Sequence, residues 1–150
     1  MTHGEIERLV SNIAENGARA LASKTEAPAM LDYVAIFSKD QAEFDELLAC
    51  VQKLGQEVDH GTQKTGHTFK LSEPMRTPIG ELSLLKIRKP DPTRPQRGAP
   101  DFVVNNYEAF KKTYLPTSGD FTLMFHPHAE MVELKGNDVL VYIKEQHLKL

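Results

Sequence analysis

Two histidines, His126 and His128, have the spacing in this chain that most directly suggests chemistry. Separated by one residue, their imidazoles would point to the same face of a β-strand and could both bind one metal ion. Further ligands would have to come from elsewhere in the chain, the candidates being His67, Glu73, Glu130 and Glu133. Pro127 between the two histidines favours the end of a strand, where both rings could instead hydrogen-bond to the backbone or to water. A divalent metal on His126 and His128 is one hypothesis, and ordinary strand-end histidines are the other.

A second pair of histidines flanks a glycine-bounded loop. His60 and His67 lie on either side of residues 61–66, GTQKTG. Such a loop could cover a pocket, and either imidazole could act as a general acid or base near neutral pH. The same residues are equally typical of a hairpin loop with no chemistry. No Walker loop, G-x-G-x-x-G, C-x-x-C pair or serine nucleophile elbow occurs, so the sequence assigns no catalytic residue.

The composition restricts the class of protein and its partners. With 150 residues, 40% hydrophobic and 26% charged, the chain has the size and composition of one globular domain. Its formal net charge of −3 gives no reason to expect nucleic acid or a membrane as a partner. Cys50 is the only cysteine, and its place on the apolar side of a predicted helix indicates a buried, inert thiol. Without a basic leader, an apolar span or a disulfide, the expected location is the cytoplasm.

The elements that must position these side chains begin with an N-terminal helix. Apolar residues recur at helical spacing from Ile6 to Leu21, and Thr2, three residues before a glutamate, has the pattern of a capping box. Gly17 is expected to weaken or end this helix. Residues 25–28 have the composition of a connector.

A strand, a helix and three strands are predicted next. Residues 33–37, YVAIF, are rich in β-branched and aromatic side chains, which is typical of a buried strand. The helix begins after Asp40, carries an apolar stripe from Phe44 to Leu54 and ends at Gly55 in a left-handed cap. Alternating residues then predict strands over 56–60, 67–71 and 81–88, separated by Gly61, Gly66, Pro74, Pro78 and Gly80.

The second half of the chain repeats this plan in a shorter form. Residues 89–100 hold four of the nine prolines and predict an extended connector, after which Asp101-Phe-Val-Val104 echoes Asp32-Tyr-Val-Ala35. A helix up to Pro116 and strands over 121–125 and 139–143 follow, while the state of residues 131–134 stays open. The chain is therefore one domain, 1–150, comprising an N-terminal helix and connector (1–28), a first module (29–90), a proline-rich connector (91–100) and a second module (101–150).

This order of elements resembles the vicinal oxygen chelate, or glyoxalase-like, superfamily. Two local stretches, Thr68 to Pro74 followed by the strand Leu82 to Arg88, and Met124-Phe-His-Pro127, are similar to those of the uncharacterised YecM-like branch. The resemblance implies an α+β fold in which two tandem β-α-β-β-β modules follow the N-terminal helix.

The same resemblance places a metal site that this sequence does not retain. Metal-dependent members supply ligands from the first and last strand of each module, and the corresponding residues here are Tyr33, Phe102 and Lys86, none of them a usual ligand. The resemblance therefore implies a domain without the usual metal or another cofactor, holding a small, perhaps anionic, organic ligand between the modules. Tyr33, His67 and Lys86 would be its wall residues.

Other interpretations of the same residues stay open. Lys86 could contact a carboxylate, form a Schiff base if burial lowered its pKa, or simply pair with Glu73 or Asp101. A relocated metal at His126 and His128 would make the chain a lyase, isomerase or dioxygenase. A non-catalytic module that forms a homodimer through the connector or the N-terminal helix is the third alternative.

Overall fold

The computed structural model describes residues 1–59, 64–126, 129–136 and 138–146. Three helices lie in this part of the chain: α1 (His3–Ala22), α2 (Gln41–Val51) and α3 (Tyr107–Tyr114). Its strands are β1 (Ala29–Phe37), β2 (Gly55–Val58), β3 (Gly66–Thr77), β4 (Gly80–Arg88), β5 (Gly98–Val104), β6 (Phe121–Phe125), β7 (Glu130–Lys135) and β8 (Leu140–Lys144). The expected mixed α+β class with an N-terminal helix is confirmed. None of the described helices combines the length and apolarity that crossing a membrane requires.

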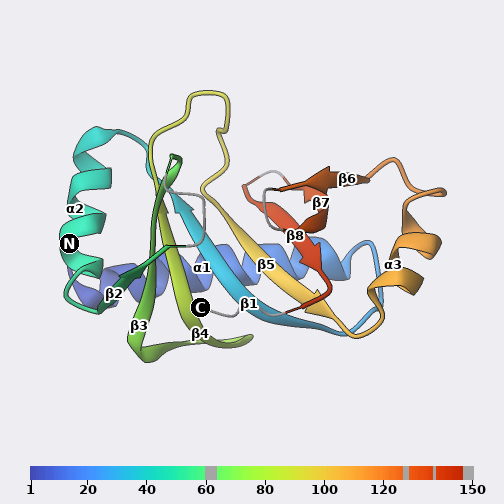
Figure 1. Cartoon of the computed structure of the whole chain (residues 1–150), viewed down its shortest axis with the longest axis horizontal. Coiled ribbons are helices and arrows are strands. Elements are labelled where there is room, and N and C mark those ends of the chain that lie inside the picture. Colours follow the sequence, from blue (N-terminus) through green and yellow to red (C-terminus); the bar gives the residue numbers. More distant parts are fainter. Residues whose placement is uncertain (60–63, 127–128, 137, 147–150) are drawn as a thin grey trace.

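The strands form one mixed sheet in the order β2-β3-β4-β1-β5-β8-β7-β6 (Figure 1). At its centre β1 and β5 are antiparallel, while β1 is parallel to β4 and β5 is parallel to β8. Along the chain, β1-α2-β2-β3-β4 is followed by β5-α3-β6-β7-β8. Each half thus has a β-α-β-β-β order, which is compatible with two tandem modules.

The N-terminal helix α1 is continuous and packs across one face of the sheet. The Thr2 hydroxyl caps it by accepting a hydrogen bond from the backbone N–H of Glu5. Of the two outcomes expected at Gly17, the helix continues through it. Packing outweighs the low helix propensity of glycine, because a Cβ at this position would overlap the ring of Pro100 on β5. Glycine therefore permits the close approach of helix and sheet, and the apolar stripe of α1 is not free to contact a partner.

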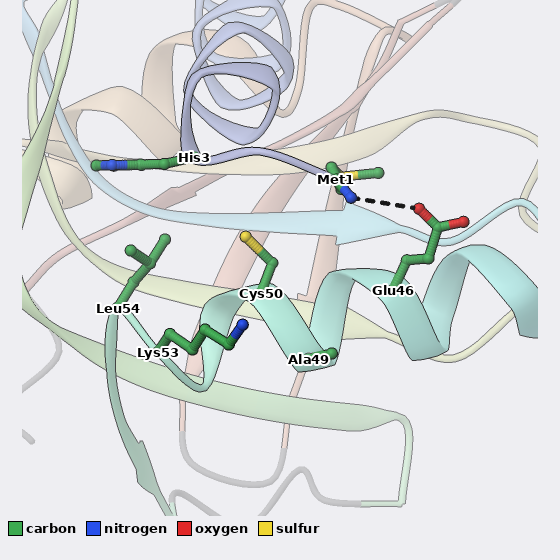
Figure 2. Close-up of a pocket in the computed structure, with 7 residues that line it drawn as sticks. All are labelled: Met1, His3, Glu46, Ala49, Cys50, Lys53 and Leu54. Atoms are coloured by element: carbon green, nitrogen blue, oxygen red, sulfur yellow. Dashed lines mark ion pairs between the residues drawn. The ribbon is translucent and has the colours of Figure 1, made fainter.

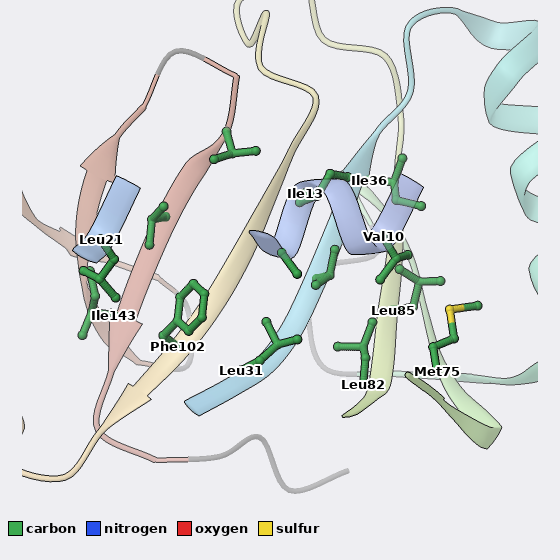
Figure 3. Packing of buried hydrophobic residues seen from close by; sticks show 14 of the residues in the cluster. Val10, Ile13, Leu21, Leu31, Ile36, Met75, Leu82, Leu85, Phe102 and Ile143 are labelled. Carbon is green, nitrogen blue, oxygen red and sulfur yellow. The ribbon is translucent and has the colours of Figure 1, made fainter. Parts of the chain in front are cut away.

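All three helices bury their apolar residues on this same face of the sheet. Figure 3 shows Val10, Ile13 and Leu21 of α1 against strand residues such as Ile36 and Phe102. The core there includes Phe44 of α2 and Phe110 of α3 as well. Burial of this apolar surface is the main source of stability for the fold.

Several predicted boundaries differ from the structure. Gly55 is not a left-handed helix cap but the first residue of β2, where a Cβ would overlap the backbone of Lys70. Pro74 does not end β3, because the pairing of β3 with β4 shifts between Lys70 and Met75 and the strand tolerates a proline there. The proline-rich connector is shorter than expected, since β5 already begins at Gly98. Residues 131–134, whose state the sequence left open, lie within β7.

Candidate functional site

The face of the sheet opposite the helices carries a buried layer of polar and charged side chains. Strand residues alternate between faces, so Lys86, between the core residues Leu85 and Ile87, points away from the helices. The same alternation turns Thr68, Asp101 and Lys144 to this side. We call it the polar face, and its apolar members are Tyr33, Ala35, Phe37, Leu84, Ala99, Leu140 and Tyr142.

At the centre of the polar face, one lysine is held by two carboxylates. Lys144 Nζ lies 2.7 Å from Asp32 Oδ2 and 3.2 Å from Asp101 Oδ2, and all three side chains are buried. Asp32 reaches this side because the pairing of β1 with β5 shifts between Leu31 and Tyr33. Such a β-bulge lets two consecutive residues face the same way.

The ionisation of this cluster is set by burial. Desolvation raises the pKa of Asp101 to about 6, against the opposing attraction of Lys144, and the neighbouring charge of Asp32 raises the pKa further. Burial also raises the pKa of Tyr33 above its usual range. Its phenol is therefore neutral, and it shares a hydrogen bond with Thr68 Oγ1 at 3.1 Å.

Lys86 lies on the same face in a different environment. Its side chain is 8% exposed, yet Nζ donates a hydrogen bond to the hydroxyl of Thr65, an exposed residue, at 2.5 Å. Lys86 is therefore a buried residue whose amine contacts an exposed one. Burial first, and then the charge of Arg88, lower the pKa of Lys86 to about 8, although Asp101 opposes the shift.

Arg88 lies near Lys86, Arg94 lies near Arg88, and both arginines form long ion pairs. Arg88 lies over the ring of Phe37 at 4.9 Å and has a single 3.5 Å contact with Asp91. Arg94, from the connector, has its nearest approach to Glu133 at 4.0 Å. Because a guanidinium has five N–H donors, neither contact saturates these groups.

Tyr142 links Arg94 to the second half of the sheet. Its hydroxyl accepts a hydrogen bond from Arg94 Nη1 at 3.3 Å and donates one to Glu133 Oε2 at 2.9 Å. Burial first, then Glu133, raise the pKa of Tyr142 to about 12. The ring of His126 packs edge-on against it with centroids 5.4 Å apart, and partial desolvation of the imidazole lowers its pKa.

The structure brings together two of the three predicted wall residues. Tyr33 and Lys86 both lie on the polar face. His67 does not join them, because its neighbour Thr68 occupies that face and His67 points to the helix side. There its ring lies 6.1 Å from that of Phe44, and Nδ1 pairs with Glu57 at 2.8 Å.

The predicted histidine metal site is only half described. His126 is exposed at the end of β6, whereas His128 and Pro127 lie outside the described residues, as does His60 of the other histidine pair. One candidate ligand is engaged elsewhere, since Glu130 accepts hydrogen bonds from Tyr107 and Lys111. In the ranges that the structure describes, no three His, Cys, Asp or Glu side chains gather as a metal site would require.

The polar face also does not fit the divalent metal that glyoxalase-like enzymes hold. Two carboxylates, Asp32 and Asp101, do converge there, but the ammonium of Lys144 lies against both of them. Lys86 adds a second amine on the same face. A divalent ion would meet repulsion from these groups, so the donor set is that of an internal ion pair.

Sequence reasoning missed the two most buried charged members of this face. Phe102 was expected at the position facing the ligand, but it lies in the helix-side core, and Asp101 takes the polar face instead. Lys144 was placed just beyond the last predicted strand, which in fact includes it. Alternation in Val141-Tyr-Ile-Lys144 was the signal that could have identified it.

A separate hollow lies between the N-terminus and α2. Its volume is about 410 Å³, and it is lined by Met1, His3, Glu46, Ala49, Cys50, Lys53 and Leu54 (Figure 2). The Met1 amino group contacts Glu46 at 3.7 Å beside it. Cys50 is half-buried rather than buried, as it lines this hollow. The side chains that line this hollow do not form a recognisable catalytic or metal-binding group. The polar face is therefore the better candidate for the functional site.

Comparison with known proteins supports the fold and goes no further. No family model and no curated protein matches the sequence. One solved structure, titled "Structural Genomics, Protein EC4020", has a TM-score of 0.67 with 11% sequence identity, covering 96% of this chain and 85% of that chain. The two chains share an overall fold.

Proposed function

We propose that this chain is a glyoxalase-like domain, near the YecM-like branch, that binds a small carboxylate-bearing ligand on its polar face. The observation that carries the proposal is the grouping of three cationic side chains. The charge of Arg88 acts on Lys86 and that of Arg94 acts on Arg88, and both arginines have only long ion pairs among the described residues. The β-α-β-β-β order of both halves supports the superfamily. No metal takes part in this account.

The arrangement of β4 suits recognition of a small anion. Lys86 and Arg88 share one face of the strand two residues apart, so their Cα atoms are separated by about 7 Å. Across the sheet Lys86 pairs with Thr68 on one side and with Ala35 on the other, and Ala35 pairs in turn with Ala99. A ligand of a few heavy atoms is therefore the size class that we propose.

Arg97 shows what a saturated arginine looks like in the same molecule. It forms a bidentate pair with Glu43, with contacts of 2.6 and 2.9 Å, and Nη1 also donates to the carbonyl of Phe37. Arg88 and Arg94 have no comparable bidentate partner among the described residues. A ligand carboxylate would supply one, because its two oxygens match the guanidinium fork.

A thermal-shift series tests this proposal. Oxalate, malonate and pyruvate should raise the melting temperature of the full chain, since a ligand that binds only the native state stabilises it, whereas methylammonium chloride should not. Arg88→Gln and Arg94→Gln should remove most of the shift. Lys112→Gln, which deletes the same charge at an exposed site on α3, should retain it. Equal shifts in all four proteins, or none in the wild type, would refute the proposal.

A further inference from the structure

The strands β2 and β6 at the two ends of the sheet differ in composition (Figure 1). β2 carries a charged side chain, Glu57, which pairs with His67. β6 has five residues, Phe121-Thr-Leu-Met-Phe125, and contains neither a charge nor a proline. Its last residue, Phe125, is 78% exposed, more than any other large apolar side chain among the described residues. Charges and prolines are what usually keep an edge strand from pairing with another chain, and β6 lacks both.

The direction of the backbone groups of β6 follows from its pairing with β7. Just beyond the strand, the N–H of His126 donates to the carbonyl of Ala129 at 2.9 Å, in register with the pairs of β6 and β7. Because backbone groups alternate along a strand, those of the even-numbered residues turn toward β7 and those of the odd-numbered residues turn outward. The odd-numbered residues are Phe121, Leu123 and Phe125. Within the described part of the chain, β6 pairs with β7 alone.

One antiparallel register lets a second copy of β6 use all of these outward groups. Odd-numbered residues must face each other, and the whole strand is paired when Leu123 lies opposite Leu123 of the second copy. Phe121 then lies opposite Phe125, and about six backbone hydrogen bonds form. Asp120 lies opposite His126, so no two like charges meet. A twofold axis relates the two copies, so the pairing closes as a dimer and does not grow into a filament.

The same register gives the exposed Phe125 side chain an aromatic surface to contact. Within one chain, the ring of Phe121 lies 5.4 Å from that of Phe110 and 5.6 Å from that of Tyr114, both on α3. Side chains of directly opposite residues lie on the same face of a sheet with Cβ atoms about 5 Å apart. Phe125 of one copy would therefore extend the aromatic cluster of the other, where offset and edge-on ring contacts are favourable.

We infer that two copies of this chain form a dimer through antiparallel pairing of their β6 strands, which joins two eight-stranded sheets into one. A five-residue edge contact is smaller than a standard protein interface, so the dimer is weak, with a dissociation constant on the order of 10–100 µM. The pairing needs no ligand on the polar face. It therefore stands or falls separately from the proposed function.

Sedimentation equilibrium of the full chain tests this inference at concentrations well below and well above the expected constant. The wild-type chain should change reversibly from monomer to dimer and form nothing larger, because the pairing uses up the β6 edge of each copy. A chain that stays monomeric at every concentration, or that continues to larger assemblies, would refute the inference. Binding of an extended apolar peptide to a chain that stays monomeric would assign the edge to another partner and equally overturn the dimer.

Two exposed apolar residues provide a matched pair of variants. Phe125→Lys removes the aromatic contact and places a charge at the edge, so it should weaken dimerisation at least about tenfold. Met30→Lys makes the same kind of change at a residue that is 60% exposed on β1, separated from β6 by β5, β8 and β7. It should leave the dissociation constant unchanged. Equal constants for the two variants would contradict pairing through β6.

Like and unlike charges at the twofold axis test the register. Leu123→Lys and Leu123→Glu each place two like charges opposite one another, so each variant alone should be monomeric. An equal mixture of the two should form a heterodimer, which would also show that both variants fold. A mixture of folded variants that does not associate would refute the pairing centred on Leu123. If either variant fails to fold, the comparison of Phe125→Lys with Met30→Lys decides.

Discussion

The two halves of the polar face each bury a lysine on their last strand, and they use it differently. On β8, Lys144 is enclosed by two carboxylates from the central strands β1 and β5. On β4, Lys86 reaches an exposed hydroxyl and lies near Arg88 and the connector. The two lysines thus have similar positions in the fold, but their partners and the charges around them differ.

This difference separates a lysine held between two carboxylates from a lysine that has a second cation beside it. A buried ammonium between two carboxylates has its hydrogen bonds and counter-charge supplied, so removing it leaves uncompensated charges. An ammonium that desolvation disfavours, with a second cation on its strand, can gain by binding an anion or by losing its proton. The first lysine therefore contributes to the stability of the sheet, and the proposed function places the ligand near the second.

Removing the structural lysine should have the largest effect. Lys144→Met leaves Asp32 and Asp101 buried without their counter-ion and should cost about 3–5 kcal/mol of unfolding free energy. Urea denaturation measures this loss. The triple variant Asp32→Asn, Asp101→Asn, Lys144→Met should recover most of it, because no buried charge remains. A loss below about 1 kcal/mol for Lys144→Met would contradict the assignment.

The pH dependence of stability should report Asp101. Its pKa is raised from the ordinary 3.8 to about 6 in the folded chain, so the native state binds more protons between these values. The contribution is fully present below about pH 4 and is lost as pH rises through 6, a fall of about 2–3 kcal/mol. Asp101→Asn should abolish this component of the pH profile, measured by urea unfolding at pH 4 and 7. An unchanged slope would show that another group titrates.

Lys86→Met should stabilise the chain modestly. The folded pKa of about 8 lies below the ordinary 10.5, so wild-type stability should rise as pH increases between these values and be lower below 8. Replacing the amine by an apolar side chain should add about 1–2 kcal/mol at neutral pH, after allowance for solvent screening. Parallel melts from neutral to alkaline pH check this, and the variant should lack the alkaline rise. A destabilised variant would assign Lys86 a structural role like that of Lys144.

The smallest effect on stability is expected at Arg94. Its contact with Glu133 is long and partly exposed, so Arg94→Gln should change the unfolding free energy by less than about 0.5 kcal/mol. The same change should weaken carboxylate binding. A comparison of denaturation and ligand titration on one sample tests both statements, and a loss of stability equal to that of Lys144→Met would contradict them.

The sequence was sufficient for the fold class and for part of the site. The strands containing Lys86 and Tyr33 were predicted within the observed β4 and β1, and the resemblance placed both residues on the side that faces a ligand. Helix caps at Thr2 and Asp40 were also predicted, since a capping side chain and its acceptor geometry are local. Strands and helix caps could be predicted because they depend on residues close together in the sequence.

The prediction that Tyr33 and Phe102 face the same side was wrong because of one β-bulge in the sheet, between Leu31 and Tyr33. The repeat of Asp32-Tyr and Asp101-Phe suggested equivalent faces for Tyr33 and Phe102. The bulge at Asp32 shifts β1 by one residue, so Tyr33 lies opposite Asp101 and Phe102 enters the core. A one-residue shift exchanges the faces of a strand, and nothing local to the sequence shows that a bulge is present. The place of Asp32 and Asp101 was missed for this reason, whereas Lys144 was missed because the predicted strand ended at residue 143.

Isothermal titration of oxalate tests the central claim most directly. The wild-type chain should bind one oxalate with a dissociation constant on the order of 0.1 mM, a reasonable strength for a ligand of this size. Arg88→Gln and Arg94→Gln should each weaken binding about tenfold, and Lys112→Gln should not. Absence of saturable binding to the wild type, or equal affinity in all four proteins, would contradict a carboxylate site on the polar face.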